Sequence, residues 1–174
     1  MLLIIDRLLG RSESARESEA QPIRIAFMCV QNAGRSQIAT AFAERERERR
    51  ALTERVEILT GGTRPADHVH EVVVEAMAQE EFDLSGRTPE YVDLEELKTC
   101  DYLVTMGCSI AEFNPTSFGV ESREWALPDP EGEDIEAVRE IRDDIEGRVR
   151  SLFDEIEEAH RSESKGERGA VPEQ

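Results

Sequence analysis

The feature that most constrains the fold is an apolar run at residues 23–30, in which Arg24 is the single charged side chain. A run of this length without strict alternation is typical of a strand that is buried on both faces. Such strands belong to parallel sheets, because the connections between parallel strands place helices over both faces. The run therefore predicts a parallel sheet with helices on each side.

The rest of the chain alternates helical and extended patterns. Helices are expected at residues 36–50, 69–79 and 94–98, and further strands at residues 56–59, 102–106 and 122–126. The clearest element is a long amphipathic helix, in which apolar residues recur at three- and four-residue spacing: Ile135, Val138, Ile141, Ile145, Val149, Leu152 and Ile156. This order predicts an α/β fold, a single flavodoxin-like three-layer sandwich with a four-stranded parallel sheet and helices on both faces.

The 174 residues are enough for one domain with its own core, which we expect at residues 22–160. Residues 6–21 are polar, and residues 1–21 together predict a flexible N-terminal extension, as residues 161–174 predict a flexible C-terminal tail. The apolar start, residues 1–5, is short and soon followed by charge, so it makes a poor signal peptide. No stretch approaches the roughly 20 apolar residues of a membrane span, and we expect a cytoplasmic protein.

The charge balance excludes several kinds of partner. The formal net charge is −18, from 21 basic and 39 acidic residues, and such a field repels nucleic acid and anionic membranes. Only two of the basic residues are lysines, Lys98 and Lys165. An acid-rich, lysine-poor surface indicates a halophilic protein that stays in solution where salt screens its self-repulsion. An ordinary acidic cytosolic protein is the competing interpretation.

The first strand ends at a thiol, and a short loop then leads into the first expected helix. Cys29 stands at the loop entrance and Arg35 at its exit, six positions later. In open parallel sheets the ligand binds beyond the carboxyl ends of the strands, where this loop lies. A helix N-terminus and a nearby arginine favour the thiolate, which is the nucleophilic form. The competing interpretation is a buried cysteine without a catalytic role.

The loop also has the composition of an oxyanion-binding nest. Its expected amide donors are Val30, Gln31, Asn32, Ala33, Gly34 and Arg35. Small residues let the backbone curl so that several N–H groups point toward one anion. Arg35 adds a two-pronged donor, and Ser36 offers its hydroxyl to the sulfur. Asn32 tolerates the left-handed conformation that a tight loop often requires.

A carboxylate late in the chain is the candidate general acid. Asp129 stands between Pro128 and Pro130, whose fixed backbone torsions hold it in place. We expect it at the end of the fourth strand, on the same rim of the sheet as Cys29, where it can protonate a leaving group. The competing interpretation is an ordinary acidic turn.

The remaining thiols and histidines carry weaker signals. Cys100 and Cys108 form no Cys-x-x-Cys pair, which indicates a reducing compartment. Cys100 is expected to be structural. His68 and His70 resemble part of a metal site, but no acidic or cysteine partner stands at a recognisable spacing, so we expect no metal.

These motifs together resemble the low-molecular-weight protein tyrosine phosphatase superfamily, and within it the thiol-dependent arsenate reductases. The resemblance covers roughly residues 23–158 and is carried by residues 29–39, 65–70, 73–77, 83–86, 104–108 and 125–130. Gln37 and Glu131 stand where the phosphatases usually have proline and tyrosine, which favours the reductases. Ala33, Gly34 and Cys108 are similar to the branch that uses a small thiol such as mycothiol.

The resemblance implies a mechanism without a bound cofactor. The loop and Arg35 hold arsenate, the Cys29 thiolate attacks arsenic, Asp129 protonates the departing oxygen, and a second thiol completes the reduction. In the thioredoxin-coupled branch two further cysteines act in sequence. Here Cys108 stands at or beside the first of these positions, and Asn114 stands at the second. Cys108 is therefore either a resolving or a structural thiol, and the reductant is thioredoxin, glutaredoxin or a small cytosolic thiol.

Two other functions compete with arsenate reduction. A phosphatase acting on phosphotyrosine or another phosphomonoester would use the same groups through a phosphocysteine intermediate, because phosphate and arsenate are nearly isosteric. Its pocket needs aromatic walls, and only 5% of the chain is Phe, Trp or Tyr. Phe113, Phe118 and Trp125 are the candidates for such walls. A non-catalytic oxyanion sensor is disfavoured because nucleophile, arginine and acid are all present. We expect a monomer whose partners are the oxyanion and the thiol reductant.

Overall fold

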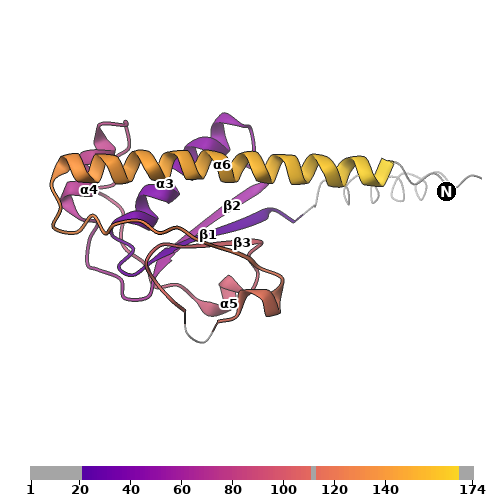
Figure 1. Cartoon of the computed structure of the whole chain (residues 1–174), viewed down its shortest axis with the longest axis horizontal. Helices are drawn as coiled ribbons and strands as arrows, with labels where there is room; N and C mark the ends of the chain where they lie inside the picture. The colour runs from indigo at the N-terminus through magenta and orange to yellow at the C-terminus, as the bar shows by residue number, and fades with distance from the viewer. Residues whose placement is uncertain (1–20, 111–112, 169–174) are drawn as a thin grey trace, which may run out of the picture.

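The computed structural model describes residues 21–110 and 113–168 and contains a four-stranded parallel sheet (Figure 1). The strands are β1 (Ile23–Cys29), β2 (Val56–Gly62), β3 (Tyr102–Thr105) and β4 (Glu121–Glu124). Their order across the sheet is β2-β1-β3-β4, and each neighbouring pair is parallel. The prediction of a four-stranded parallel α/β sheet is confirmed.

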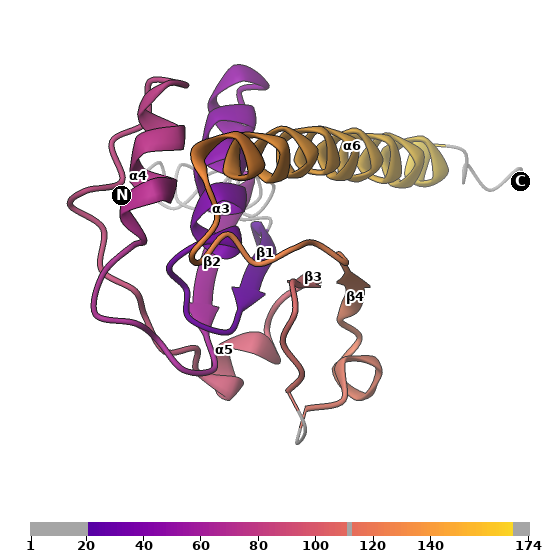
Figure 2. The same ribbon diagram turned by 60° about the vertical axis from the view of Figure 1, so that its left-hand side comes forward.

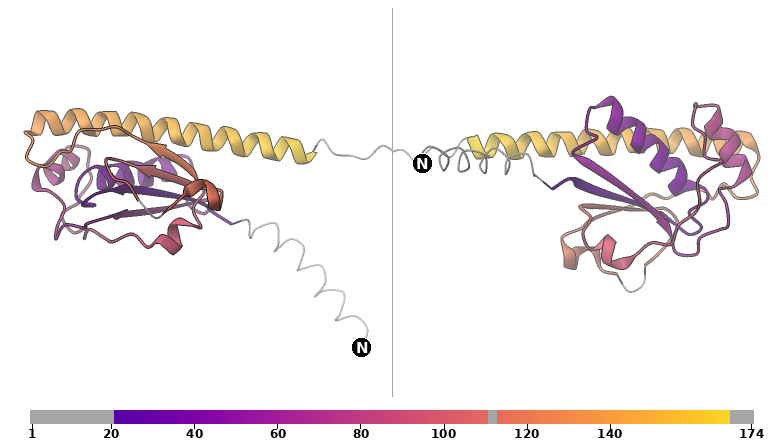
Figure 3. Two further views of the ribbon diagram at one scale, coloured as in Figure 1. Left: turned by 60° about the horizontal axis from the view of Figure 1, so that its bottom comes forward. Right: turned by 180° about the vertical axis from the view of Figure 1, so that it is seen from behind.

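Helices cover both faces of this sheet, unequally. The helices α3 (Arg35–Arg49), α4 (Glu71–Ala78) and α6 (Ile135–Arg168) lie on one face, and the short α5 (Leu94–Leu97) lies on the other (Figures 1 and 2). A 3-10 helix, η1 (Pro115–Phe118), precedes β4. Figure 3 shows the sheet between α6 and α5, which is the expected three-layer arrangement.

The central strand β1 explains why the first apolar run has no polar face. Side chains alternate across a strand, so Ile25 and Phe27 belong to the core cluster under α3 and α6, whereas Ala26 and Met28 belong to the cluster on the α5 side. All four side chains are fully buried. Because β1 pairs with β2 on one edge and β3 on the other, its C-terminal residue, Cys29, ends in the middle of the sheet.

Most element boundaries differ from the predicted ones by a few residues, and two of the differences matter for the site or the tail. The strand β4 ends at Glu124, so Asp129 lies in the following loop rather than at the strand end. The helix α6 continues to Arg168 through the first part of the segment expected to be a flexible tail. Its extension is polar, and its charges pair along the helix, as in Arg161 with Glu157 at 3.8 Å, which apolar periodicity does not reveal. Residues 1–20 and 169–174 lie outside the described residues.

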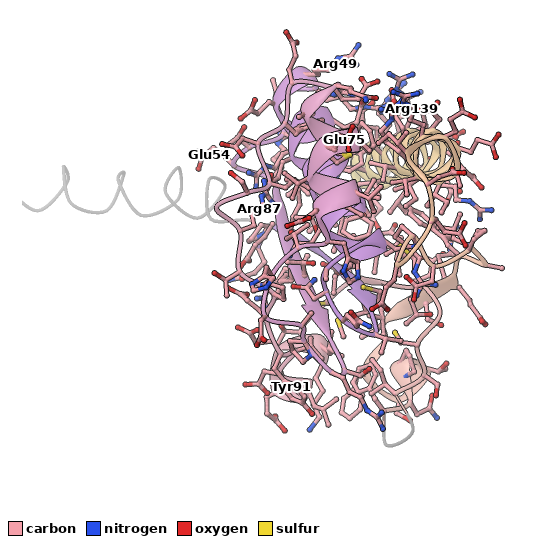
Figure 4. All side chains as sticks on the ribbon, turned by 90° about the vertical axis from the view of Figure 1, so that its left-hand side faces the viewer. Arg49, Glu54, Glu75, Arg87, Tyr91 and Arg139 are labelled. Carbon is pink, nitrogen blue, oxygen red and sulfur yellow. The ribbon has the colours of Figure 1, made fainter. Side chains whose placement is uncertain are left out.

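The outer surface is densely charged. Side chains such as Arg49 and Glu54 project from the body (Figure 4), and acidic and basic groups pair over α3 and α6, as in Arg50 with Asp154 at 2.8 Å. Within the described part of the chain, no helix is both long enough and apolar enough to cross a membrane.

Candidate active site

The loop after β1 wraps a buried thiol at the N-terminus of α3. Cys29 is 3% exposed, and its Sγ lies 2.8 Å from Ser36 Oγ. Asn32 Nδ2 donates to the same Oγ at 2.7 Å and to Thr60 Oγ1 at 2.8 Å. Because the Ser36 oxygen already accepts from Asn32, the Ser36 hydroxyl hydrogen remains available to donate to the sulfur. The arrangement therefore places a hydroxyl donor beside the sulfur.

Asn32 stabilises the conformation of the loop through its backbone and its side chain. Its φ of 50° lies in the left-handed region, which few non-glycine residues adopt and which asparagine tolerates better than most. Gln37 Nε2 donates to the Asn32 carbonyl at 3.0 Å and to Asn32 Oδ1 at 3.1 Å, and the Glu90 N–H donates to Oδ1 at 2.9 Å. These bonds lock both the backbone and the side chain of Asn32.

The loop carbonyls turn away from the thiol toward the segment after β2. Three of them accept backbone N–H groups there: Val30 O from Arg64 (2.7 Å), Gln31 O from Ala66 (2.9 Å) and Ala33 O from His70 (3.0 Å). In contrast, the N–H groups of residues 31–34 donate to no acceptor in the described part of the chain. Adjacent unpaired amides at a helix N-terminus form a site for an anion.

Arg35 is held in place before any ligand arrives. It is 7% exposed, and its Nη1 donates to the Leu127 carbonyl at 3.1 Å while its Nη2 lies 3.6 Å from Asp129 Oδ2. Gly107, which follows β3 with a φ of +69°, packs against the same guanidinium, and a Cβ at that position would collide with Arg35 Nη1. The two segments after β3 and β4 therefore fix the arginine at the carboxyl edge of the sheet.

Asp129 reaches this edge on a loop that is tied to the Cys29 loop. Its Oδ1 accepts the Glu131 N–H at 3.0 Å, and Gln31 Nε2 donates to Glu131 Oε2 at 2.8 Å. A Cβ on Gly34 would lie 2.7 Å from Pro130 Cγ, so the close approach of the two loops requires glycine at this position. The structure thus brings the predicted nucleophile loop, arginine and acid together.

The other two cysteines have different surroundings. Burial raises the pKa of the Cys108 thiol, a backbone hydrogen bond from Met106 lowers it, the charge of Cys29 raises it, and the charge of Arg35 lowers it. Cys108 therefore lies in the electrostatic field of the loop. Cys100 is buried on the α5 side and donates to the Glu96 carbonyl at 3.5 Å, and burial raises its pKa to about 11. A thiol in that state suits a structural position.

Three supports of the site have no assigned role in the sequence analysis. These supports are the hydrogen bonds from Gln37 to Asn32 within the loop, the contact of Gly107 with Arg35 and the hydrogen bond from Arg35 to the Leu127 carbonyl. The last two join residues far apart in the chain. Gly107, two residues beyond the end of β3, is the sequence signal that could have indicated a close approach at this edge.

A parallel α/β fold with a cysteine and an arginine at the first β–α loop defines a class of proteins that bind tetrahedral oxyanions beside a thiol. The chain belongs to the low molecular weight phosphotyrosine protein phosphatase family, whose model matches residues 24–162. The resemblance inferred from the motifs is therefore confirmed.

Relatives in this family include proteins named as arsenate reductases. The chain is 64% identical over 133 residues to a putative arsenate reductase of Halobacterium salinarum, covering 76% of this chain and 92% of the relative. It is 26% identical to a glutaredoxin arsenate reductase of Synechocystis, covering 76% and 98%. The solved thioredoxin-dependent arsenate reductase of Corynebacterium glutamicum superposes with a TM-score of 0.65 at 32% identity, covering 88% of this chain and 71% of that one. The Halobacterium relative accords with the halophilic composition.

Proposed function

We propose that the protein is an arsenate reductase that depends on an external thiol reductant. The observation that carries this proposal is the convergence of Cys29, Arg35 and Asp129 at one edge of the sheet, with a further thiol, Cys108, in the field of the first two. The name of the 64% identical relative supports arsenate as the oxyanion.

In the first step the Cys29 thiolate displaces an oxygen from arsenate. The oxygens bind to the N–H groups of residues 31–34 and to Arg35, which is already ordered by Leu127 and so loses little freedom on binding. The sulfur–arsenic bond forms, one arsenic–oxygen bond breaks, and Asp129 supplies the proton with which the leaving hydroxide departs as water. The Ser36 hydroxyl donates to the thiolate until it attacks.

In the second step two electrons pass to arsenic. The Cys108 thiolate attacks Cys29 Sγ, the disulfide forms as the sulfur–arsenic bond breaks, and the bonding pair leaves with arsenic as arsenite. A thiol reductant then reopens the disulfide. The names of two relatives favour thioredoxin or glutaredoxin for this role, and a small cytosolic thiol is the alternative suggested by Ala33 and Gly34 in the loop. Because burial raises the pKa of Cys108, this step accelerates as the pH rises toward that pKa.

The competing function is hydrolysis of a phosphomonoester at the same loop. The aromatic side chains near the site give it little support. Trp125 is buried and packs against Phe27 with ring centroids 6.0 Å apart, so it belongs to the core. Phe113 is buried too and stacks on Phe118. Phe118 is the one of the three candidates that exposes much of its ring, at 46%.

The test measures arsenate-dependent thiol oxidation in high salt with three donors supplied separately: thioredoxin with its reductase, glutaredoxin with its thiol, and a small thiol alone. Parallel samples receive p-nitrophenyl phosphate. We expect arsenate turnover with at least one donor and none in the Cys29→Ser variant. Phosphate-ester turnover without arsenate reduction under any donor would make the protein a phosphatase.

The part played by Cys108 needs its own comparison, with Cys100→Ser as the matched control. We expect Cys108→Ser to stop multiple turnover with every donor while one equivalent of arsenate still reacts with Cys29. Cys100→Ser should keep multiple turnover. If Cys108→Ser turns over normally on a small thiol, the external thiol attacks directly and Cys108 is structural.

A further inference from the structure

A cluster of metal-ligating side chains lies beside the Cys29 loop, built from segments far apart in the chain. His70, Asp129 and Glu131 each present one ligand atom, and these atoms lie within 4.8 Å of one another. His70 is half-buried and both carboxylates are exposed, so an ion reaches the cluster from solvent. Within residues 21–110 and 113–168, no hydrogen bond or ion pair joins the His70 ring to either carboxylate.

The backbone and second-sphere bonds hold the three ligands in position. The His70 N–H donates to the Ala33 carbonyl at 3.0 Å, Glu131 Oε2 accepts from Gln31 at 2.8 Å, and the Glu131 N–H donates to Asp129 Oδ1 at 3.0 Å. Partners of this kind orient metal ligands in proteins and strengthen their sites. Each ligand-bearing segment is thus anchored, directly or through Glu131, to the loop that carries the thiol.

Gly34 shows how closely the two segments converge. A Cβ on Gly34 would lie 2.7 Å from Pro130 Cγ and 3.6 Å from His70 Cδ2. The imidazole and the loop of Asp129 and Glu131 therefore meet over the same glycine. Van der Waals packing at Gly34 thus contributes to the convergence, in addition to the polar contacts of the two carboxylates.

The donor set suits a divalent transition-metal ion. The three residues offer one imidazole nitrogen and two carboxylate oxygens, which are ligand types that zinc accepts, and their number equals that of catalytic zinc sites, where three protein ligands leave a fourth position open. Two ligand atoms on one zinc ion lie at most about 4 Å apart. Side-chain rotations that move the ligand atoms by about 1 Å would therefore bring all three within bonding distance of one ion. The two carboxylates outweigh the single positive charge of Arg35, which lies 3.6 Å from Asp129.

We propose that His70, Asp129 and Glu131 bind a divalent transition-metal cation of the zinc type and that the bound ion inhibits the enzyme. A carboxylate that ligates a metal no longer delivers a proton, so occupancy removes Asp129 from the oxyanion chemistry. Metal binding itself is independent of the proposed function, whereas the inhibition rests on it. The His68 and His70 pattern alone predicts no metal, because the two partner ligands come from the loop after β4 and not from a neighbouring position.

Binding is tested first, by titrating Zn²⁺ calorimetrically into protein carrying Cys29→Ser and Cys108→Ser, since free thiols also bind zinc. His70→Gln and Glu131→Gln are added singly to this background. His68→Gln and Glu133→Gln are the matched controls, as exposed residues of the same types outside the cluster. We expect one zinc site that weakens at least tenfold in each of the first two variants and less than twofold in the controls. Trp125 fluorescence verifies that every variant is folded.

Affinity in His70→Gln and Glu131→Gln equal to that of the background, or losses as large in the controls, would overturn the metal site. Titration with Co²⁺ supplies a second readout, because its visible absorption reports the ligand field. That spectrum should be lost in His70→Gln and kept in His68→Gln.

Inhibition is then measured on the chain with all three cysteines, with free Zn²⁺ fixed by a metal buffer and each rate divided by the same variant's metal-free rate. We expect His70→Gln to raise the half-inhibitory zinc concentration at least tenfold and His68→Gln to leave it unchanged. Zinc binding without arsenate turnover would refute the proposed function and leave the site standing. Arsenate turnover without zinc binding would refute the site alone, and binding without inhibition would refute its inhibitory effect.

Discussion

The helical face of the sheet and its carboxyl edge are built on different principles. Under α3 and α6 the contacts are repetitive: Val138, Ile145, Val149 and Phe153 follow one another along α6, and each is fully buried. At the carboxyl edge the contacts are individual, such as the hydrogen bond from Arg35 to Leu127 O. Repetitive apolar burial distributes stability over many side chains, whereas the edge depends on particular atoms. The first region should therefore govern folding, and the second should govern chemistry.

The largest effect expected from this contrast is at Arg35. Arg35→Lys keeps the charge but loses the two-pronged donor that reaches both Leu127 O and the oxyanion. We expect kcat/KM for arsenate to fall about 10³-fold, with the free energy of unfolding changed by less than about 1 kcal/mol. Steady-state kinetics and urea unfolding measure the two quantities. Arg139→Lys is the surface control. If kcat/KM fell less than tenfold in Arg35→Lys, the claim that the carboxyl edge governs the chemistry would be wrong.

A core substitution on α6 should show the opposite pattern. Ile145→Ala removes a fully buried side chain and should lower the free energy of unfolding by about 3 kcal/mol, through lost burial and the cavity left behind. Activity well below the melting temperature should stay within about twofold. The exposed Glu140 on the same helix supplies the control, because Glu140→Ala should change stability by less than about 0.5 kcal/mol. A large activity loss in folded Ile145→Ala would show that the two regions are coupled.

Asp129→Asn separates proton donation from oxyanion binding at the carboxyl edge of the sheet. The amide keeps the size of the side chain and removes the proton that the leaving hydroxide needs, so arsenate turnover should fall about 10²-fold. The arsenate concentration for half-saturation should change much less, because the loop amides and Arg35 remain. Glu133→Gln, two residues beyond Glu131, should leave the rate unaltered. If the arsenate concentration for half-saturation rose and kcat did not fall, Asp129 would act in arsenate binding instead of proton donation.

The smallest effect concerns Cys100 and the pH dependence of stability. Its thiol pKa is raised from 9.0 to about 11 by burial. Below pH 9 the thiol is protonated in both the folded and the unfolded chain. Between pH 9 and 11 the unfolded chain releases the proton and the folded chain holds it, so stability falls as the pH rises.

Cys100→Ala should remove that part of the alkaline loss, on the order of 1–2 kcal/mol, as measured by urea unfolding at a series of pH values. Ser122→Ala, at an exposed position of β4, should keep the parent slope. Identical slopes for the parent and Cys100→Ala would mean that the thiol is hydrated in the folded state.

The same contrast explains how far the sequence could predict the molecule. Apolar patterns located the buried strands β1 and β3 and the first part of α6, because burial imposes such patterns on neighbouring residues. They carry less information about β4, whose residues Glu121–Glu124 are polar and mostly exposed. They did not locate the end of α6, whose last turns are polar and held by pairs such as Arg161 and Glu157. Spacing identified Cys29 and Arg35 within one loop. It could not place His70 beside Glu131, because that neighbourhood depends on two loops meeting over Gly34.

Because β1 lies in the middle of the sheet, residues in and just after it must wait during synthesis until their partners later in the chain have been made. Arg24 meets Glu57, 33 residues later, and Asp101, 77 residues later, while Gln31 meets Glu131 after 100 residues. Synthesis proceeds at about 5–20 residues per second, so the thiol of Cys29 is made about 5–20 s before the loop that closes over it. During that interval a nucleophilic cysteine is attached to the ribosome without its partners. A reducing environment therefore protects the Cys29 thiol while the chain is being synthesised, as well as during catalysis.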